Sequence, residues 1–130
     1  MNDGTGGGTL DAVVWISGAL AVGSALLAVA HAGVRIPVLS ALGPGGSEPV
    51  VPAAIAFTVA TCLHGAVAYG VARRRGWAWP LGVLVAAVTL IGAAVPFRGV
   101  GSVIGIALAG TELGLLLTGR IRRAILRPAS

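Results

Sequence analysis

The sequence predicts an all-α fold, a four-transmembrane-helix antiparallel bundle with short turns. Two observations support this prediction. Hydrophobic residues make up 56% of the 130 residues and charged residues only 10%, whereas a soluble domain carries roughly 25% charged residues. Four long apolar stretches alternate with segments that contain most of the prolines and all of the arginines. Lipid must therefore supply most of the surface.

The first part of the chain is predicted to hold a tail, a span and a long connection. Residues 1–9 are polar and Gly-rich, which predicts a disordered N-terminal tail. The apolar run over residues 10–34 predicts the first span. Residues 35–50 follow it, and their prolines and paired glycines exclude a continuous helix. Within this connection, residues 36–42 form a short apolar segment suited to the membrane interface.

Three further spans are predicted over residues 51–72, 77–95 and 102–118. Pro52 and Pro80 fall in the first turn of the second and third spans, where a missing backbone N–H costs nothing. The fourth span is short, near the lower limit of about 17 residues. Because the turns between these spans are also short, consecutive helices are expected to be antiparallel neighbours.

The four spans form one membrane domain, residues 10–118, and residues 119–130 are predicted to be a basic cytoplasmic tail. In this tail Ile121, Ala124 and Ile125 alternate with arginines at helical spacing. Such a pattern is typical of an amphipathic helix that lies at the membrane interface.

The arginines predict the orientation. All nine basic residues are arginine, and only Arg35 and Arg98 lie in the connections after the first and third spans. The positive-inside rule then predicts a multi-pass protein of the cell (inner or plasma) membrane with both termini in the cytoplasm. The other seven arginines lie after the second and fourth spans: Arg73, Arg74, Arg75, Arg120, Arg122, Arg123 and Arg127.

Aromatic residues agree with this orientation. Trp15, Tyr69, Trp77 and Trp79 all fall near the predicted cytoplasmic ends of their spans, as an interfacial aromatic belt requires. The net charge of +5 is best explained by attraction to anionic lipid headgroups. Nucleic acid is not expected as a partner, because no base-stacking aromatics alternate with the arginines.

Glu112 and His64 are the candidate functional residues, because ionisable groups inside a membrane are costly. Glu112 lies eight residues before Arg120, and His64 lies nine before Arg73. At 1.5 Å per residue, both sit ~12–14 Å inside the cytoplasmic boundary, where they are expected to meet as an intramembrane polar pair. Residues at comparable levels that could complete a polar cluster are Thr61, Cys62, Thr89 and Thr111.

This pair has two interpretations. It either ties two helices together or exchanges a proton near neutral pH as part of a relay.

The small residues of the fourth span are open to two interpretations as well. The series from Gly101 through Gly105 to Ala109 and the pair Gly110 and Gly114 would let a helix approach closely, either inside the bundle or in a homodimer.

Enzyme activity, cofactors and metals are not expected. The sequence contains no Ser–His–Asp set, no paired carboxylates and no phosphate-binding glycine loop. A single cysteine, Cys62, excludes dithiol chemistry within the chain. His31 and His64 are expected to lie roughly a dozen ångströms apart along the membrane normal, so they are poorly placed to share a metal or haem.

Two segments carry a resemblance to known sequences. They are AYG at 68–70 with RRRGWAWP at 73–80, and GRIRR at 119–123. Together they resemble uncharacterised small four-span integral membrane proteins of prokaryotes, in which a basic turn followed by a tryptophan opens the third span. The size is also similar to that of small multidrug transporters, but those carry their essential carboxylate in the first span, where this chain has only Asp11 at its edge.

The sequence therefore favours a non-enzymatic structural or accessory membrane protein. The alternative is a small proton-coupled transporter or channel-like oligomer that uses Glu112 and His64. Either role implies a protein partner, which would be a second copy of the chain or another membrane protein.

Overall fold

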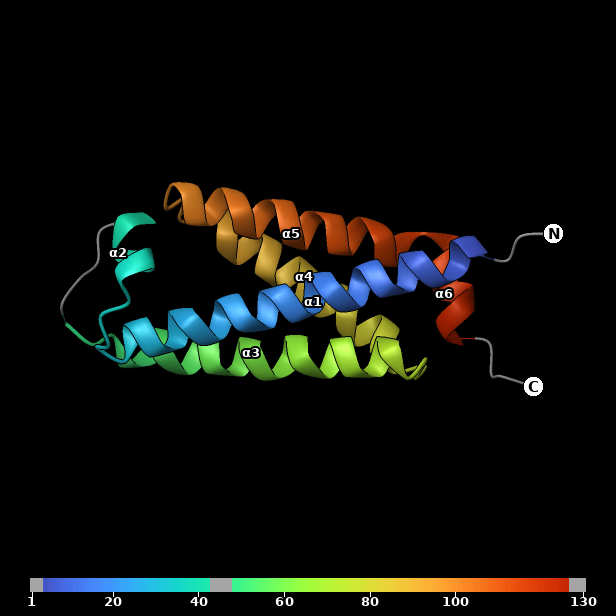
Figure 1. The fold of residues 1–130 in the computed structure, drawn as a ribbon, viewed down its shortest axis with the longest axis horizontal. Helices are drawn as coiled ribbons and strands as arrows, with labels where there is room; N and C mark the ends of the chain where they lie inside the picture. Colours follow the sequence, from blue (N-terminus) through green and yellow to red (C-terminus); the bar gives the residue numbers. More distant parts are fainter. Residues whose placement is uncertain (1–3, 43–47, 127–130) are drawn as a thin grey trace.

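A computed structural model describes residues 4–42 and 48–126 of the chain (Figure 1). These residues contain helices and no strand, which confirms the all-helical class. The helices are α1 (Gly4–His31), α2 (Pro37–Leu42), α3 (Val51–Ala72), α4 (Ala78–Ala94), α5 (Val100–Leu117) and α6 (Gly119–Leu126).

Three of the described helices are long and apolar enough to cross a membrane, as expected of a membrane protein. They are α1, over Gly7–His31, together with α3 and α5. The remaining long apolar helix, α4, has 17 residues and a length of about 26 Å at 1.5 Å per residue. It is slightly shorter than the roughly 30 Å hydrocarbon core of a typical bilayer.

The long helices are arranged as two pairs (Figure 1). α1 packs chiefly along α3, and α4 packs chiefly along α5, with less extensive contacts between α3 and α4 and between α1 and α5. We call α1 and α3 the first pair, and α4 and α5 the second pair. α2 lies at one end of the bundle, and α6 lies across the opposite end, where α1 begins and α5 finishes.

The core is concentrated in the half of the bundle that α6 covers. Three apolar side chains from α3, α5 and α6, those of Val67, Leu116 and Ile121, are almost completely buried there. Away from this core many large apolar side chains are exposed, as expected for a surface that faces lipid. The buried apolar cluster comprises Leu10, Val13, Val67, Val71, Ala78, Val85, Leu116, Ile121 and Ile125.

Gly82 allows α4 to approach both α3 and α5. A Cβ atom at this position would lie 3.0 Å from Leu116 Cδ1 and 3.2 Å from Val67 Cγ1. In α5, a Cβ at Gly105 would lie 3.1 Å from the Cβ of Ala93, whereas a Cβ at Gly114 would meet nothing within 4 Å. The small-residue face of α5 that packs inside the bundle is therefore the one that contains Gly105.

The N-terminal tail is shorter than predicted. α1 begins at Gly4, so residues 4–9 are helical and do not form a disordered tail, and residues 1–3 lie outside the described part of the chain. The physical reason is cooperativity, because extending an existing helix fixes one residue for each hydrogen bond and avoids the cost of nucleation. In the following connection, the predicted apolar segment is the helix α2.

The predicted tail after the fourth span also differs from the structure. Residues 119–126 form α6, and its apolar residues Ile121 and Ile125 are buried in the core instead of facing lipid. The chain turns back because Thr118 is extended, with ψ of 134°, and interrupts the α5 helix. Residues 127–130, which include Arg127, lie outside the described residues.

The other boundaries differ from the predicted ones by a few residues. α4 spans Ala78–Ala94 instead of 77–95, and α5 spans Val100–Leu117 instead of 102–118. Shifts of one or two residues at a helix end are normal, since helix ends fray.

Candidate functional site

Glu112 and His64 meet in the interior of the bundle. Glu112 lies on α5 and His64 on α3, and both residues are 0% exposed. Glu112 Oε2 lies 3.8 Å from His64 Nδ1. The matched depth inferred from the sequence therefore coincides with a matched orientation, which the spacing alone does not determine.

Two hydroxyl groups extend this pair on either side. Ser17 Oγ on α1 donates a hydrogen bond to Glu112 Oε1. His64 Nε2 forms a hydrogen bond of 3.0 Å with Thr89 Oγ1 on α4, in which the donor depends on the tautomer of the ring. The result is a row of four side chains, one from each long helix, which we call the polar row: Ser17, Glu112, His64 and Thr89.

Every contact within the polar row joins the two helix pairs. Ser17 on α1 contacts Glu112 on α5, and His64 on α3 contacts Thr89 on α4. The third contact, between Glu112 and His64, joins α5 to α3 across the middle of the bundle. Polar interactions therefore connect the two pairs, which pack less extensively against each other than the helices within each pair do.

Two facing atoms at the centre of the polar row lack hydrogen bonds. Among the described residues, neither Glu112 Oε2 nor His64 Nδ1 has a hydrogen-bond partner. Their separation of 3.8 Å exceeds the roughly 3.2 Å upper limit of an ordinary N–H···O bond. A small rotation of either side chain would bring an acid and a base into hydrogen-bond contact, so the geometry suits both a static tie and the transfer of a proton.

The polar row is enclosed by helix packing. Two shallow surface hollows lie elsewhere. One is lined by Gly119, Arg122, Arg123 and Leu126 on α6, and the other lies between the ends of α1 and α3 near Pro49. Ser17, Glu112 and His64 are all fully buried, so the inner part of the row is shut off from the surface.

Only one of the four companions expected from the sequence joins the row. Thr89 contacts His64, whereas Thr61 and Thr111 donate hydrogen bonds to carbonyl groups of their own helices, at 2.8 and 2.7 Å. Cys62 is exposed. Matched depth was a necessary condition but not a sufficient one, because each residue along a helix turns the side chain by about 100°.

Ser17 is the member of the polar row that the sequence analysis missed. It lies seven residues after the predicted start of the first span, which corresponds to a depth of about 10 Å. The same depth argument that linked Glu112 to His64 would therefore have included it. A serine inside an apolar helix is a weak signal on its own, since its hydroxyl often bonds the backbone of the preceding turn.

Trp79 differs from the other aromatic residues of the predicted belt. Trp15 is 79% exposed, and Tyr69 and Trp77 are also exposed. Trp79 is half-buried, and its Nε1–H donates to the backbone carbonyl of Leu116 at 2.8 Å. The last carbonyls of a helix have no partner within it, so this indole satisfies a group that the end of α5 leaves open.

The described arginines after α3 and α5 lie at the end of the bundle that α6 covers, three in the turn after α3 and three on α6 itself (Figure 1). Arg73 lies with its guanidinium carbon 5.5 Å from the centre of the Tyr69 ring, and Arg122 lies 5.1 Å from that of Trp79. Both distances are typical of cation–π contacts. Arg35 and Arg98 belong to the connections at the opposite end, after α1 and α4.

The remaining histidine lies apart from the polar row. His31 Nδ1 is 2.7 Å from the carbonyl oxygen of Leu27 on its own helix, and its ring packs 5.1 Å from that of Phe57. Within residues 4–42 and 48–126, no three His, Cys, Asp or Glu side chains gather as metal ligands would.

No family model, curated protein or solved structure matches this chain. The resemblance to small four-span prokaryotic membrane proteins, drawn from the arginine–tryptophan turn and the basic C-terminal segment, therefore stays a prediction.

Proposed function

We propose that this protein is a non-enzymatic structural or accessory protein of the cell membrane, with four spans and both termini in the cytoplasm. Its polar row joins two helix pairs into one unit. The observation that supports this role best is the complete enclosure of Glu112, whose carboxyl group accepts a hydrogen bond from Ser17 and faces His64. A transported substrate would need a path to that carboxyl group, and packed helices surround it.

The four-span topology is supported by charge and by length. Three arginines in the turn after α3 and three on α6 lie at one end of the bundle, whereas single arginines follow α1 and α4. The positive-inside rule places the richer end in the cytoplasm. The deficit of a few ångströms in α4 is small, because a bilayer thins around a short span at a modest cost.

The polar row supports a structural role because it specifies the depth at which the helices pack. A one-turn slip of any long helix displaces its side chains by about 5.4 Å, which would break a contact of the row and leave a polar group in an apolar interior. Interhelical hydrogen bonds in membranes contribute roughly 0.6–2 kcal/mol each. Apolar contacts between Gly- and Ala-rich faces change less when a helix slips by one turn, so they distinguish the native packing from the slipped one less strongly.

The experiment is a comparison of Glu112→Gln with Glu48→Gln in purified protein, by thermal unfolding in a mild detergent. Glutamine preserves the size of the side chain and still accepts the hydrogen bond from Ser17, but it cannot ionise opposite His64. Glu112→Gln should therefore lower the midpoint, and by only a few degrees. Glu48 is exposed, so its substitution should leave the midpoint unchanged and serves as the control. Equal midpoints for both variants would contradict a structural role for the carboxyl group.

One observation favours a second candidate function, a proton-coupled transporter or channel-like oligomer. The facing atoms Glu112 Oε2 and His64 Nδ1 are buried without hydrogen-bond partners among the described residues, and an acid and a base so placed could relay a proton. Access from each side would require the two helix pairs to move against each other, as the repeats of many transporters do.

Reconstituted vesicles discriminate between the two functions. For a transporter, an imposed pH gradient drives a flux that Glu112→Gln abolishes while the unfolding midpoint stays close to that of the wild type. For a structural protein, wild type and Glu112→Gln show the same background proton leak as empty vesicles, and the variant is less stable.

A further inference from the structure

The exposed face of α6 is basic, because the apolar face of this helix packs against the bundle. Ile121 and Ile125 are buried against the bundle, so the helix cannot insert its apolar side into lipid. Arg120, Arg122 and Arg123 are exposed on the remaining surface. Of the described acidic residues only Asp11 belongs to this end of the bundle, since Glu112 is buried and Glu48 precedes α3. The end that α6 covers therefore attracts anions.

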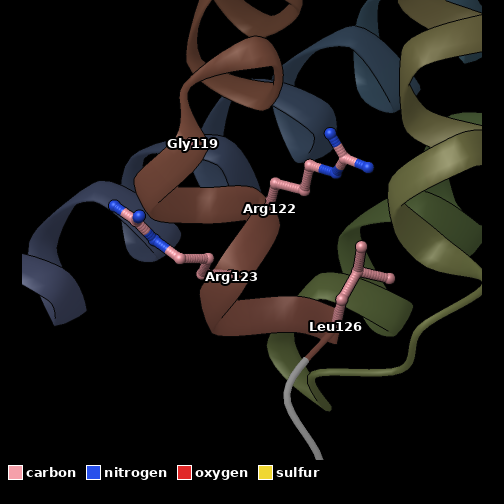
Figure 2. A pocket seen from close by; sticks show the side chains of 4 residues that line it. All are labelled: Gly119, Arg122, Arg123 and Leu126. Atoms are coloured by element: carbon pink, nitrogen blue, oxygen red, sulfur yellow. The ribbon is translucent and has the colours of Figure 1, made fainter.

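A shallow hollow of about 330 Å³ lies on this face, lined by Gly119, Arg122, Arg123 and Leu126 (Figure 2). Its volume is at the lower end of the range of small-molecule sites, roughly 300–1,000 Å³. In Figure 2 the two arginine side chains extend to opposite sides of α6, Arg122 toward α4 and Arg123 toward the start of α1. The hollow thus has cationic sides, with an apolar residue, Leu126, in its wall.

Arg122 is held in place by an aromatic contact. Its guanidinium carbon lies 5.1 Å from the centre of the Trp79 ring, and Trp79 is anchored by its hydrogen bond to the Leu116 carbonyl. A guanidinium carries five N–H donors, so a contact with one aromatic ring leaves donors available for a phosphate. Ordering the cation before the anion arrives lowers the entropy cost of binding.

The hollow lies at the level where the spans end. α5 finishes at Leu117 and α4 starts at Ala78, and Trp79 and Leu116 join these two helix ends. Trp77, next to this point in sequence, is 46% exposed, as suits a residue in contact with the glycerol and upper acyl region of a lipid. A phospholipid would place its phosphate beside Arg122 and its apolar part against such side chains, whereas a free anion would use only the arginines.

We propose that this hollow binds the phosphodiester headgroup of an anionic phospholipid, with Arg122, which lies over the Trp79 ring, as its main contact and with Arg123 adding positive charge on the other side of α6. The proposal rests on the membrane orientation given above, which puts α6 at the headgroups of the cytoplasmic leaflet. The number of arginines alone predicts that anionic headgroups are attracted to the whole end of the bundle. The proposal assigns one specific site at this end.

The test is lipid binding by the purified full-length chain in a neutral detergent, where no charged leaflet attracts all the arginines together. Phosphatidylglycerol and phosphatidylcholine with the same acyl chains are titrated, and bound lipids are counted by native mass spectrometry. The wild type should bind phosphatidylglycerol preferentially. Arg122→Ala should weaken that binding about fivefold, and Arg122→Lys should restore only part of it because lysine lacks the planar fork.

Arg120→Ala is the matched control, because Arg120 lies on the same helix, is exposed and does not line the hollow. It should change phosphatidylglycerol binding less than twofold. Equal losses for Arg120→Ala and Arg122→Ala would overturn the proposal in favour of diffuse charge attraction. Equal binding of the two lipids by the wild type would overturn it directly.

Inorganic phosphate provides the last comparison. If millimolar phosphate displaces phosphatidylglycerol as effectively as excess phosphatidylglycerol does, the hollow is an anion site and the lipid proposal is wrong. Failure of the proposed orientation would be detected separately, by a reporter fused to the C-terminus. An external C-terminus combined with a loss of lipid binding confined to Arg122→Ala would refute the topology and keep the site.

Discussion

Replacing Gly82 by alanine tests whether the close approach of three helices holds the bundle together. The added Cβ would lie 3.0 Å from Leu116 Cδ1 and 3.2 Å from Val67 Cγ1. Both neighbours are completely buried, so neither side chain has open space into which to move. α4 must then shift away from α3 and α5, or the two neighbours must adopt poorer rotamers.

The expected magnitude combines two opposing effects. Overpacking a closely packed core typically costs about 1–3 kcal/mol. Alanine is favoured over glycine in a helix by roughly 0.5–1 kcal/mol. Gly82→Ala should therefore lower the free energy of unfolding by about 1 kcal/mol, within a range of roughly 0–2.5 kcal/mol from these two principles.

Gly114→Ala is the control, because a Cβ there meets nothing within 4 Å. It should raise the free energy of unfolding by roughly 0.5–1 kcal/mol, the helix preference alone. Both variants are compared with wild type by equilibrium unfolding in one mild detergent, followed by circular dichroism. If Gly82→Ala is as stable as Gly114→Ala, the three helices do not meet as closely as the structure shows and the reasoning is wrong.

Three further outcomes are expected. Ser17→Ala removes the donor to Glu112 and should lower the free energy of unfolding by about 1–3 kcal/mol, measured in the same detergent assay; an unchanged value would mean that the hydroxyl contributes nothing to the row. Ile121→Ala should cost about 2–5 kcal/mol by leaving a cavity under α6, and a loss below 1 kcal/mol would show that α6 is not part of the core. A reporter active only outside the cytoplasm, fused after Ser130, should give no signal, and a strong signal would reverse the proposed orientation.

The number and type of the long helices could be predicted from the sequence because they depend on local properties. An uninterrupted apolar run in lipid must satisfy its own backbone hydrogen bonds, and a helix does so within the segment. Prolines and arginines interrupt these runs, so α3, α4 and α5 begin and end within about two residues of the predicted positions. The depth of a residue in the membrane also depends only on local sequence, because a fixed rise per residue converts its distance in sequence from the arginines at the end of the span into a depth. On this basis Glu112 and His64 are predicted to lie at one depth.

Only the tertiary structure decided which faces of the helices meet. Rotation about each helix axis is set by contacts with residues far away in sequence. Depth alone therefore admitted Thr61 and Thr111, which bond to their own helices, and could not single out Ser17, the residue that donates to Glu112. The same holds for α6. Its alternating pattern is compatible with lipid or with protein as the apolar partner, and the extended residue Thr118 turns it onto the core. The local pattern specifies that Ile121 must be buried, and the path of the chain in space decides what buries it.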